Sequence, residues 1–446
     1  MHLIPNHARA EEMLATMGMT DVQELFQDIP ADLRIDGLNL PVAEPERTLV
    51  SRLRRLLAKN RTYDSMCIFL GGGLKPQLVP ASVKAVAHRQ ELINAYTPYQ
   101  PEVSQGLLQA LFEYQSLMAD ITQMEVVNSS MYDGLTALGE AGLMCARATR
   151  NRNRFLVPKN LSWQKRSILE NYTRGAGMTI ADYGYDDVTG QADVDSLKAA
   201  VGDDVCGVYV ENPNYFGIFE TELETIRDIA HEAGALFVMG IDPTTMGIAT
   251  PPGKLGADIV VGEASCFGGA PAVGGPLLGL FATTEKLVRK MPGRLIGATT
   301  DADGKRGYVM TLQAREQHIR RAKATSNICS NEALLSVQAA IHLTLLGRTG
   351  LRTMGLQNLK AGAELENVLT AAGLEKRFTG PSYNEVVTRA PDGLHEQLLA
   401  ADVHGGLPLK RDLPELADCM LWGSTPVHTD WHREQLANAL QLEVLA

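Results

Sequence analysis

The chain has 446 residues, of which 45% are hydrophobic and 21% are charged. At roughly 150 residues per domain, this length predicts two to three domains of a soluble globular protein. The net charge of -11 disfavours a nucleic-acid partner or an anionic membrane surface, because both require a basic face. Six cysteines without CxxC spacing indicate reduced thiols in a cytoplasmic protein, with no disulfide framework and no metal site.

The first 60 residues predict a helical arm. Apolar side chains recur at helical spacing in residues 8–17, 21–27 and 49–57. The N-terminus has no apolar signal-peptide segment, and no window approaches ~18 uninterrupted apolar residues. We therefore expect neither a secretory signal nor a membrane span.

Residues 61–330 predict a large α/β domain. Short apolar runs are typical of strands buried on both faces, and they occupy residues 206–210, 235–241, 257–261 and 277–282. A helix should lie between the first two runs, from a capping box of Thr221 and Glu224 to Gly234. Strand–helix–strand units of this kind give a parallel sheet with right-handed crossovers.

Residues 331–446 predict a smaller α+β domain. Its expected helices occupy residues 331–346, 356–372 and 430–442. Its expected strands lie near residues 385–389 and 419–422. No internal repeat or low-complexity linker separates the domains, so we expect them to pack closely.

Two polar features mark candidate ligand positions in the large domain. Ser129 and Ser130 lie in a loop before a helix over 135–146, and a helix N-terminus binds phosphate through free N–H groups. The plainer interpretation is that Ser130 or Asp133 caps the helix. Asp242 follows the run 235–241, at the end of a strand where α/β sheets bind ligands, although an Asp-Pro pair is also a common turn.

Two further segments suit a pocket wall or a partner surface. The loop 95–102 contains Tyr96, Thr97 and Tyr99 together with two prolines, and a structural turn explains it equally well. A basic run in this acidic chain suits an acidic partner or a phosphate, although a solvated helix face is the plainer alternative. The run consists of Arg315, His318, Arg320, Arg321 and Lys323.

Together these segments resemble the glycine cleavage system P-protein family, alpha-subunit type. The most specific stretches are 311–320, TLQAREQHIR, and 323–331, KATSNICSN. Supporting stretches are 95–106, NSSMYDG at 128–134, NPNYFG at 212–217, MPGR at 291–294, GE at 262–263 with GGP at 274–276, and GGLP at 405–408. The resemblance covers essentially the whole chain. It implies the α/β fold type I of pyridoxal-phosphate enzymes: a helical arm, a large domain around a mostly parallel sheet, and a small C-terminal α+β domain.

The resemblance also implies a reaction and partners. Glycine is decarboxylated on pyridoxal phosphate, and the aminomethyl group passes to the lipoyl arm of the H-protein. The cofactor lysine belongs to a beta subunit, and the alpha subunit completes the site, as an α2β2 assembly. In this chain the position of that lysine falls at about Ser265, while Lys254 and Lys286 lie in a loop and a helix away from it. We therefore expect the chain to be inactive alone.

The resemblance assigns roles to particular residues of this chain. Ser129, Ser130 and Asp242 would be vestiges of the ancestral phosphate and ring-nitrogen contacts. A second group would reach a shared site or brace the interface, and it consists of Tyr96, Thr97, Tyr99, Arg315, His318, Arg320, Arg321, Thr325, Ser326 and Asn327.

Several positions depart from the family pattern. They are Lys75, Gln77, Ser162-Trp163, Ser424-Thr425-Pro426 and the stretch 262–271. Drift in a subunit that never holds the cofactor explains them, and so does a paralogue that acts on another amino acid. Two alternatives from other classes are a self-sufficient pyridoxal enzyme that uses Lys75, and a non-catalytic scaffold for a pyridoxal-phosphate partner.

Overall fold

The structure is a computed structural model that describes residues 6–35, 37–62, 65–73, 75–93, 95–150, 152–270, 276–328 and 332–441. Residues Gly274, Gly275, Cys329 and Asn331, which belong to the stretches of family resemblance or to the cysteine count, lie outside the described residues. The chain forms two compact units, Met1–Arg61 and Thr62–Ala446. No helix in the described ranges is both long enough and apolar enough to cross a membrane.

The first unit is helical, as the sequence predicts. It contains α1 (Ala10–Thr16) and α2 (Glu46–Leu57). The segment expected to be an α-helix over 21–27 is instead a 3-10 helix, Val22–Phe26, which Asp21 caps reciprocally with Glu24. The apolar side chains of α2 have little within the unit to pack against, and Leu53, Leu56 and Leu57 are exposed.

A seven-stranded sheet forms the centre of the second unit. Its strand order is β2-β8-β7-β6-β5-β3-β4, and the last five strands are parallel. β8 runs antiparallel to β7, and β2 runs antiparallel to β8. The expected mostly parallel sheet is therefore confirmed. The strands are β2 (Val126–Val127), β3 (Arg154–Pro158), β4 (Thr179–Tyr183), β5 (Val205–Asn212), β6 (Leu236–Ile241), β7 (Ile259–Glu263) and β8 (Gly279–Thr283).

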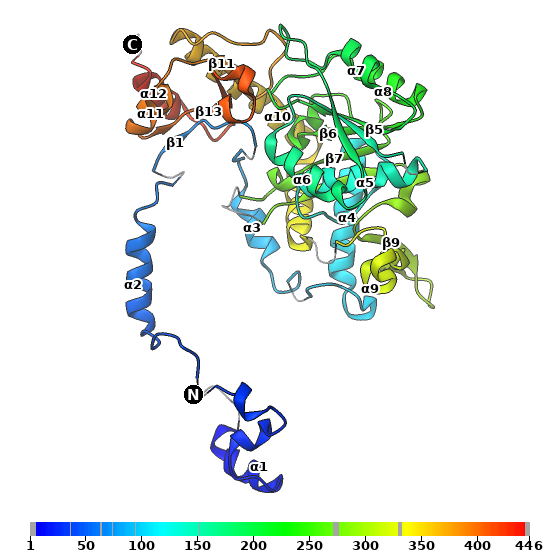
Figure 1. Ribbon diagram of the computed structural model, residues 1–446, viewed down its shortest axis with the longest axis vertical. Coiled ribbons are helices and arrows are strands. Elements are labelled where there is room, and N and C mark those ends of the chain that lie inside the picture. The colour runs from blue at the N-terminus through cyan, green and yellow to red at the C-terminus, as the bar shows by residue number, and fades with distance from the viewer. Residues whose placement is uncertain are drawn as a thin grey trace. The chain divides into compact units, whose positions relative to one another are not determined.

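Helices pack on both faces of this sheet (Figure 1), because central strands such as β5 are buried along their whole length. One face is covered by α5 (Gly134–Ala148) and α6 (Trp163–Arg174), which share a buried apolar cluster with the strands. The other face is covered by α4 (Gln105–Thr122), α7 (Val194–Ala200), α8 (Leu223–Glu232) and part of α10 (Ala333–Ala371). This is the layered arrangement of an α/β protein.

The end of α8 agrees with the sequence prediction, but its beginning does not. Gly234 has a positive φ of 69° directly after the helix, as its stop signal predicts. At the N-terminus the predicted capping box of Thr221 and Glu224 is wrong. The N-cap is Glu222, without a side-chain cap. The Thr221 hydroxyl is engaged elsewhere, because it accepts a hydrogen bond from Gln191 at 3.2 Å.

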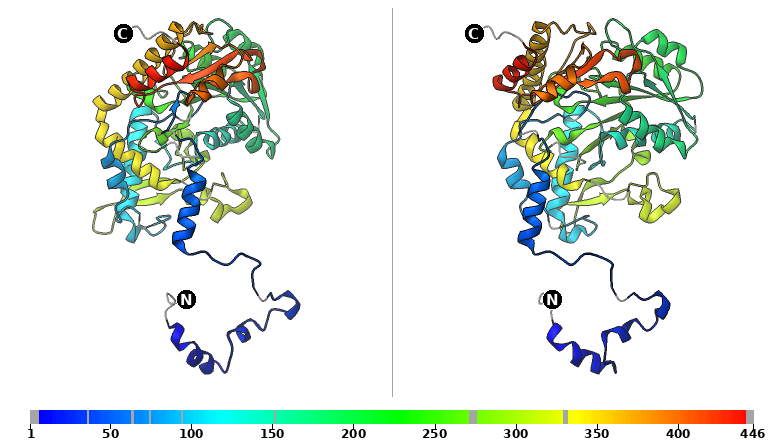
Figure 2. Two further views of the ribbon diagram at one scale, coloured as in Figure 1. Left: turned by 90° about the vertical axis from the view of Figure 1, so that its left-hand side faces the viewer. Right: turned by 60° about the vertical axis from the view of Figure 1, so that its left-hand side comes forward.

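A long helix leads to the C-terminal layer. α10 (Ala333–Ala371) is interrupted at Gly347, where the backbone leaves the helical region. Figure 2 shows this segment, in yellow and amber, running alongside the sheet towards the C-terminal elements. The two helices predicted here are thus present, and the break between them is much shorter than predicted. The predicted boundary at residue 330 stays a prediction.

The C-terminal elements pack around an apolar cluster that includes the fully buried Trp422. The strands β11 (Glu385–Arg389), β14 (Cys419–Gly423) and β13 (Leu407–Pro408) form a sheet in that order. The early strand β1 (Cys67–Ile68) pairs with β12 (Val403–His404), which places the beginning of the unit beside its end. The accompanying helices are α11 (Leu394–Ala400) and α12 (Asp430–Ala439), as predicted for the second.

Several further elements were not predicted, among them a hairpin and two short helices. β9 (Leu295–Thr300) and β10 (Arg306–Thr311) form an antiparallel hairpin. The short helices α3 (Ala81–Ala87) and α9 (Gln317–Arg320) lie before α4 and after the hairpin respectively. The basic run that begins at Arg315 therefore follows directly from the hairpin.

Candidate functional site

A cavity of about 420 Å³ opens at the carboxyl ends of three adjacent parallel strands. We call it the strand-end cavity. Each of these strands brings one acid to it: Glu211 within β5, Asp242 directly after β6, and Glu263 at the end of β7. Open α/β sheets bind their ligands at this edge. Asp242 and Ser265 both line this cavity, and the cofactor-contact role of Asp242 stays a prediction.

An ion pair at this cavity joins two segments that are far apart in the sequence. Lys75 Nζ lies 2.8 Å from Glu385 Oε2, and both side chains are about one-tenth exposed. The other oxygen, Glu385 Oε1, accepts a hydrogen bond of 2.6 Å from the backbone N–H of Gly72. Burial alone would lower the pKa of Lys75, but Glu385 and Asp242 outweigh it and raise that pKa above its ordinary value. Lys75 is therefore an ammonium ion and a poor nucleophile.

The second lysine at the cavity is also paired. Lys165 Nζ contacts Glu211 Oε1, which accepts a further hydrogen bond of 3.0 Å from the hydroxyl of Tyr209. Ser162 positions this lysine by capping α6, because its hydroxyl accepts the backbone N–H of Lys165 at 3.4 Å. Of the described residues that line the cavity, the lysines are Lys75 and Lys165. Lys254 and Lys286 are not among them.

Asp242 is both a cavity residue and a cap. Its Oδ1 accepts hydrogen bonds from the backbone N–H of Thr244 at 3.0 Å and from the Thr244 hydroxyl at 2.6 Å. The Thr244 hydroxyl is also 3.0 Å from the hydroxyl of Tyr383. The turn that the Asp-Pro pair suggests is therefore present, and it holds the carboxylate at the cavity wall.

At the N-terminus of α5, where the sequence predicts a phosphate site, a carboxylate of the chain itself is bound. Asp133 caps α5, accepting the N–H of Thr136 at 2.7 Å. The next free N–H, that of Gly134, donates to Glu263 Oε2 at 3.0 Å. The other oxygen, Glu263 Oε1, accepts the N–H groups of Ser265 and Leu278 at 3.1 and 2.9 Å. A carboxylate thus sits at the helix N-terminus where a phosphate would bind.

The two serines predicted to bind the phosphate lie away from the cavity. Ser129 and Ser130 are almost completely buried and are not among the described residues that line the cavity. The Ser129 carbonyl accepts a hydrogen bond of 2.6 Å from Ser336, which ties the loop to α10. With its phosphate position occupied and both lysines paired, this site does not fit pyridoxal phosphate bound to this chain.

Several of the departures from the family pattern line the cavity, among them Lys75, Gln77 and Ser162. Gln77 exchanges two hydrogen bonds of 3.1 Å with Asn358 of α10. Trp163 is partly exposed, with the guanidinium of Arg411 4.7 Å from its ring centre. Beside Ser265, burial raises the pKa of the Cys266 thiol well above its usual range. That thiol is therefore not a nucleophilic thiolate.

A second cluster gathers residues from three predicted segments. We call it the tyrosine–arginine cluster: Thr97, Tyr99, Arg294, Glu316 and His318. Arg294 donates to the Tyr99 hydroxyl at 3.0 Å and to the Thr97 hydroxyl at 3.4 Å. Its Nε lies 3.6 Å from Glu316 Oε2, which is 3.5 Å from His318 Nδ1. The rings of Tyr99 and His318 meet edge to face, 5.6 Å apart. The loop and the basic run are therefore brought together.

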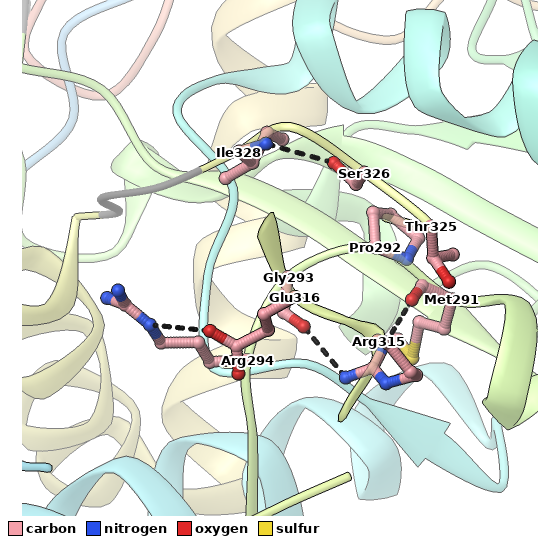
Figure 3. Close-up of a pocket in the computed structure, with 9 residues that line it drawn as sticks. All are labelled: Met291, Pro292, Gly293, Arg294, Arg315, Glu316, Thr325, Ser326 and Ile328. Atoms are coloured by element: carbon pink, nitrogen blue, oxygen red, sulfur yellow. Dashed lines mark hydrogen bonds and ion pairs between the residues drawn. The ribbon is translucent and has the colours of Figure 1, made fainter. Parts of the chain in front are cut away.

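Arg315 braces the backbone beneath this cluster (Figure 3). It donates to the carbonyls of Met291 and Gly293, the latter at 2.9 Å. Its own carbonyl accepts the N–H of Thr325 at 3.0 Å. Ser326 follows and donates to Glu140 at 2.8 Å, which connects the segment to α5.

The other predicted interface residues are exposed. Tyr96 is 80% exposed, and Arg320, Arg321 and Asn327 also lie at the surface. Arg320 donates to the carbonyl of Ala314 at 3.1 Å. An exposed position is compatible with a partner contact, and the shared-site role of these residues stays a prediction.

Sequence reasoning missed the residues that organise both sites. In the strand-end cavity these are Glu211, Glu263, Lys165 and Glu385. The first two had the same signal as Asp242, an acid at the end of an apolar run. In the tyrosine–arginine cluster the missed residues are Arg294 and Glu316, although both lie in stretches of family resemblance. Within the described part of the chain, no group of three or more His, Cys, Asp or Glu is arranged to hold a metal ion.

The fold and the cavity define the class of the protein: an α/β chain with a cavity at the carboxyl edge of a mostly parallel sheet. Residues 1–418 match the glycine cleavage system P-protein family. The chain belongs to this family, as its sequence predicts.

Similar proteins match this chain over nearly its whole length. The probable glycine dehydrogenase (decarboxylating) subunit 1 of Thermococcus onnurineus is 50% identical over 429 residues, 95% of either chain. The crystal structure of an inhibitor-bound glycine decarboxylase (P-protein) of the glycine cleavage system superposes with a TM-score of 0.89 at 37% identity, covering 99% of both chains. A sphingosine-1-phosphate lyase from Burkholderia pseudomallei shares the fold alone, with a TM-score of 0.67 and 14% identity over 92% of this chain and 94% of that one.

Proposed function

We propose that this chain is the alpha subunit of a two-subunit glycine decarboxylase, the P-protein of the glycine cleavage system. With a lysine-bearing beta subunit it decarboxylates glycine, and the aminomethyl group passes to the lipoyl arm of the H-protein. Pyridoxal phosphate, held covalently by the beta subunit, supplies the electron sink for decarboxylation. The assembly is a cytoplasmic α2β2 heterotetramer.

The observation that carries this proposal is the state of the strand-end cavity. Ser265 stands near the expected place of the cofactor lysine. Lys75 and Lys165, the lysines at the cavity wall, are both held in ion pairs. An amine must be neutral to attack the cofactor aldehyde, and the raised pKa of Lys75 opposes this. These features support a cofactor held by the partner, and they argue against Lys75 as the lysine of a self-sufficient enzyme.

The tyrosine–arginine cluster supports a role towards a partner. Tyr96 lies at the exposed tip of a loop whose base is fixed by Arg294 through Thr97 and Tyr99. A loop held at its base presents an aromatic hydroxyl in a defined position, as a shared site requires. In the other unit, the exposed leucines of α2 provide apolar surface of the kind that subunit interfaces bury.

The test is reconstitution. This chain, the beta subunit and an equimolar mixture would each be assayed for exchange of labelled bicarbonate into glycine, with pyridoxal phosphate and H-protein present. We expect exchange by the mixture and none by this chain. Full activity of the beta subunit alone would identify a scaffold instead. An assembled complex that decarboxylates another amino acid but not glycine would identify a paralogue.

A further inference from the structure

The strand-end cavity contains hydrogen-bond acceptors that the chain leaves unsatisfied. Glu211 is 4% exposed, and no donor in the described ranges reaches its Oε2. No hydrogen-bond partner in the described ranges reaches the side-chain oxygen of Gln164 or the hydroxyl of Tyr215 either, and Tyr215 as a residue is 6% exposed. All three residues line the cavity. A buried carboxylate oxygen without a donor is costly, so such a group indicates a missing partner.

The charges around the cavity indicate what that partner is. The carboxyl groups of Glu211, Asp242, Glu263 and Glu385 line it, against two ammonium groups, Lys75 and Lys165. The surplus of acids attracts a cation and repels a phosphate ester. Glu211 and Gln164 offer only acceptors through their free oxygens, so the bound group must donate several hydrogen bonds. A primary ammonium group has three donors and the required charge.

The anion-binding end of the ancestral site is closed. The Gly134 N–H already donates to Glu263. The backbone of Gly262 also approaches so closely that a Cβ built on Gly134 would lie 3.0 Å from its carbonyl. A phosphate would have to displace a carboxylate that accepts three backbone hydrogen bonds. The cavity therefore differs in specificity from a cofactor site in the same position.

We propose that the strand-end cavity binds a small α-amino acid. The ammonium group of the ligand contacts Glu211 Oε2, Gln164 Oε1 and the Tyr215 hydroxyl. Its carboxylate faces Lys165, which is partly exposed and uses one of its N–H groups on Glu211. The volume of about 420 Å³ lies near the lower end of ordinary small-molecule pockets. Glycine as the probe rests on the proposed function, whereas the binding of an ammonium group rests on the cavity alone.

The experiment measures binding of labelled glycine to the purified full-length chain by equilibrium dialysis. The matched control comes from the other end of the same strand, where Asp204 pairs with Arg154 at 2.8 Å. We expect saturable binding, weakened at least tenfold in Glu211→Gln and unchanged in Asp204→Asn. Methylamine should compete and acetate should not. Pyridoxamine phosphate should compete no better than pyridoxamine.

A milder variant guards against misfolding of Glu211→Gln. Tyr215→Phe removes one hydroxyl and should weaken glycine binding severalfold with unchanged far-ultraviolet circular dichroism. The proposal is overturned by the absence of saturable binding to the unmodified chain. It is equally overturned by unchanged affinity in both variants, or by preferential binding of the phosphorylated pyridoxamine. Exchange activity of the assembled enzyme is read separately, so failure here leaves the proposed function standing, and the converse also holds.

Discussion

The strand-end cavity and the tyrosine–arginine cluster use similar residues in opposite ways. In the cavity, each of the two lysines is held by an acid at the position where an α/β sheet binds its ligand. In the cluster, Arg294 and Glu316 join a loop, a hairpin and a basic run, and they hold an exposed tyrosine loop in place. The difference shows that similar residues can fill a sheet's ligand position with ion pairs in one place and fix the base of an exposed loop in another.

The largest effect should follow from Arg294→Ala, which removes the centre of the cluster. Arg294 and Glu316 are both less than one-tenth exposed, so the substitution removes the arginine partner of a buried carboxylate and leaves it beside His318 alone among its ion-pair partners in the cluster. We expect a loss of about 3 kcal/mol or more in the free energy of unfolding, measured with urea. Activity of the assembled enzyme should fall by about two orders of magnitude, because the loop loses its anchor.

Arg289→Ala serves as the control, because this nearby arginine is exposed. It should change the free energy of unfolding by less than about 0.5 kcal/mol. Equal effects of the two substitutions would contradict the role given to the cluster.

A second prediction concerns pH and the support of the cavity. Burial raises the pKa of Glu220 from 4.5 to about 7. This carboxyl accepts hydrogen bonds from Ala192 and from Asn214, a residue of the cavity wall. The folded state then binds a proton more tightly than the unfolded state. The contribution of Glu220 to the free energy of unfolding is therefore complete below pH 4.5 and is lost as the pH rises through 7.

The pKa difference of Glu220 between the folded and unfolded states corresponds to about 3 kcal/mol. Glu220→Gln should therefore flatten the pH dependence of the free energy of unfolding between pH 5 and 8. Urea unfolding at a series of pH values measures it. A parallel decline in the variant and the unmodified chain would assign the titration to another group.

A third prediction concerns the reactivity of Lys75 with pyridoxal phosphate. Glu385→Gln removes the partner that holds Lys75 charged, so that burial should lower the pKa of this lysine. Incubation with pyridoxal phosphate and borohydride should then modify Lys75 about tenfold more than in the unmodified chain, as a fall of one unit in pKa would give. Mass spectrometry of the peptide that contains Lys75 measures the yield. An unchanged yield would show that access, rather than charge, limits the reaction.

The smallest effect is expected for Tyr96→Phe. Tyr96 is 80% exposed in this chain, so the free energy of unfolding should change by less than about 0.5 kcal/mol. Glycine exchange by the assembled enzyme should slow by about two- to tenfold, the loss of one hydrogen bond at a shared site. Unchanged turnover would remove this residue from the shared site.

The parallel sheet could be predicted because its strands carry a local signal. Strands such as β5, which are buried on both faces, are apolar in sequence. Gly234 follows α8 with a positive φ, a conformation that glycine adopts without strain. The hairpin of β9 and β10 gave no such signal, because its pairing depends on contacts with α4. The capping box at Thr221 failed for the same reason, since a distant glutamine binds the hydroxyl.

The candidate site could be predicted only in outline. Asp242 was found from its place after a strand. The pairing of Lys75 with Glu385, however, joins residues about 300 positions apart, and no local pattern records it. The family resemblance identified the loop at Tyr99 and the run at Arg315. It did not reveal that Arg294 is the residue that links them.

The most direct measurement locates the cofactor in the assembled enzyme. The reconstituted complex would be reduced with borohydride in the presence of pyridoxal phosphate, digested, and its lysine adducts mapped by mass spectrometry. We expect the adduct on the beta subunit and none on Lys75 or Lys165. A stoichiometric adduct on either lysine of this chain would contradict the proposal and make the chain a pyridoxal-phosphate enzyme in its own right.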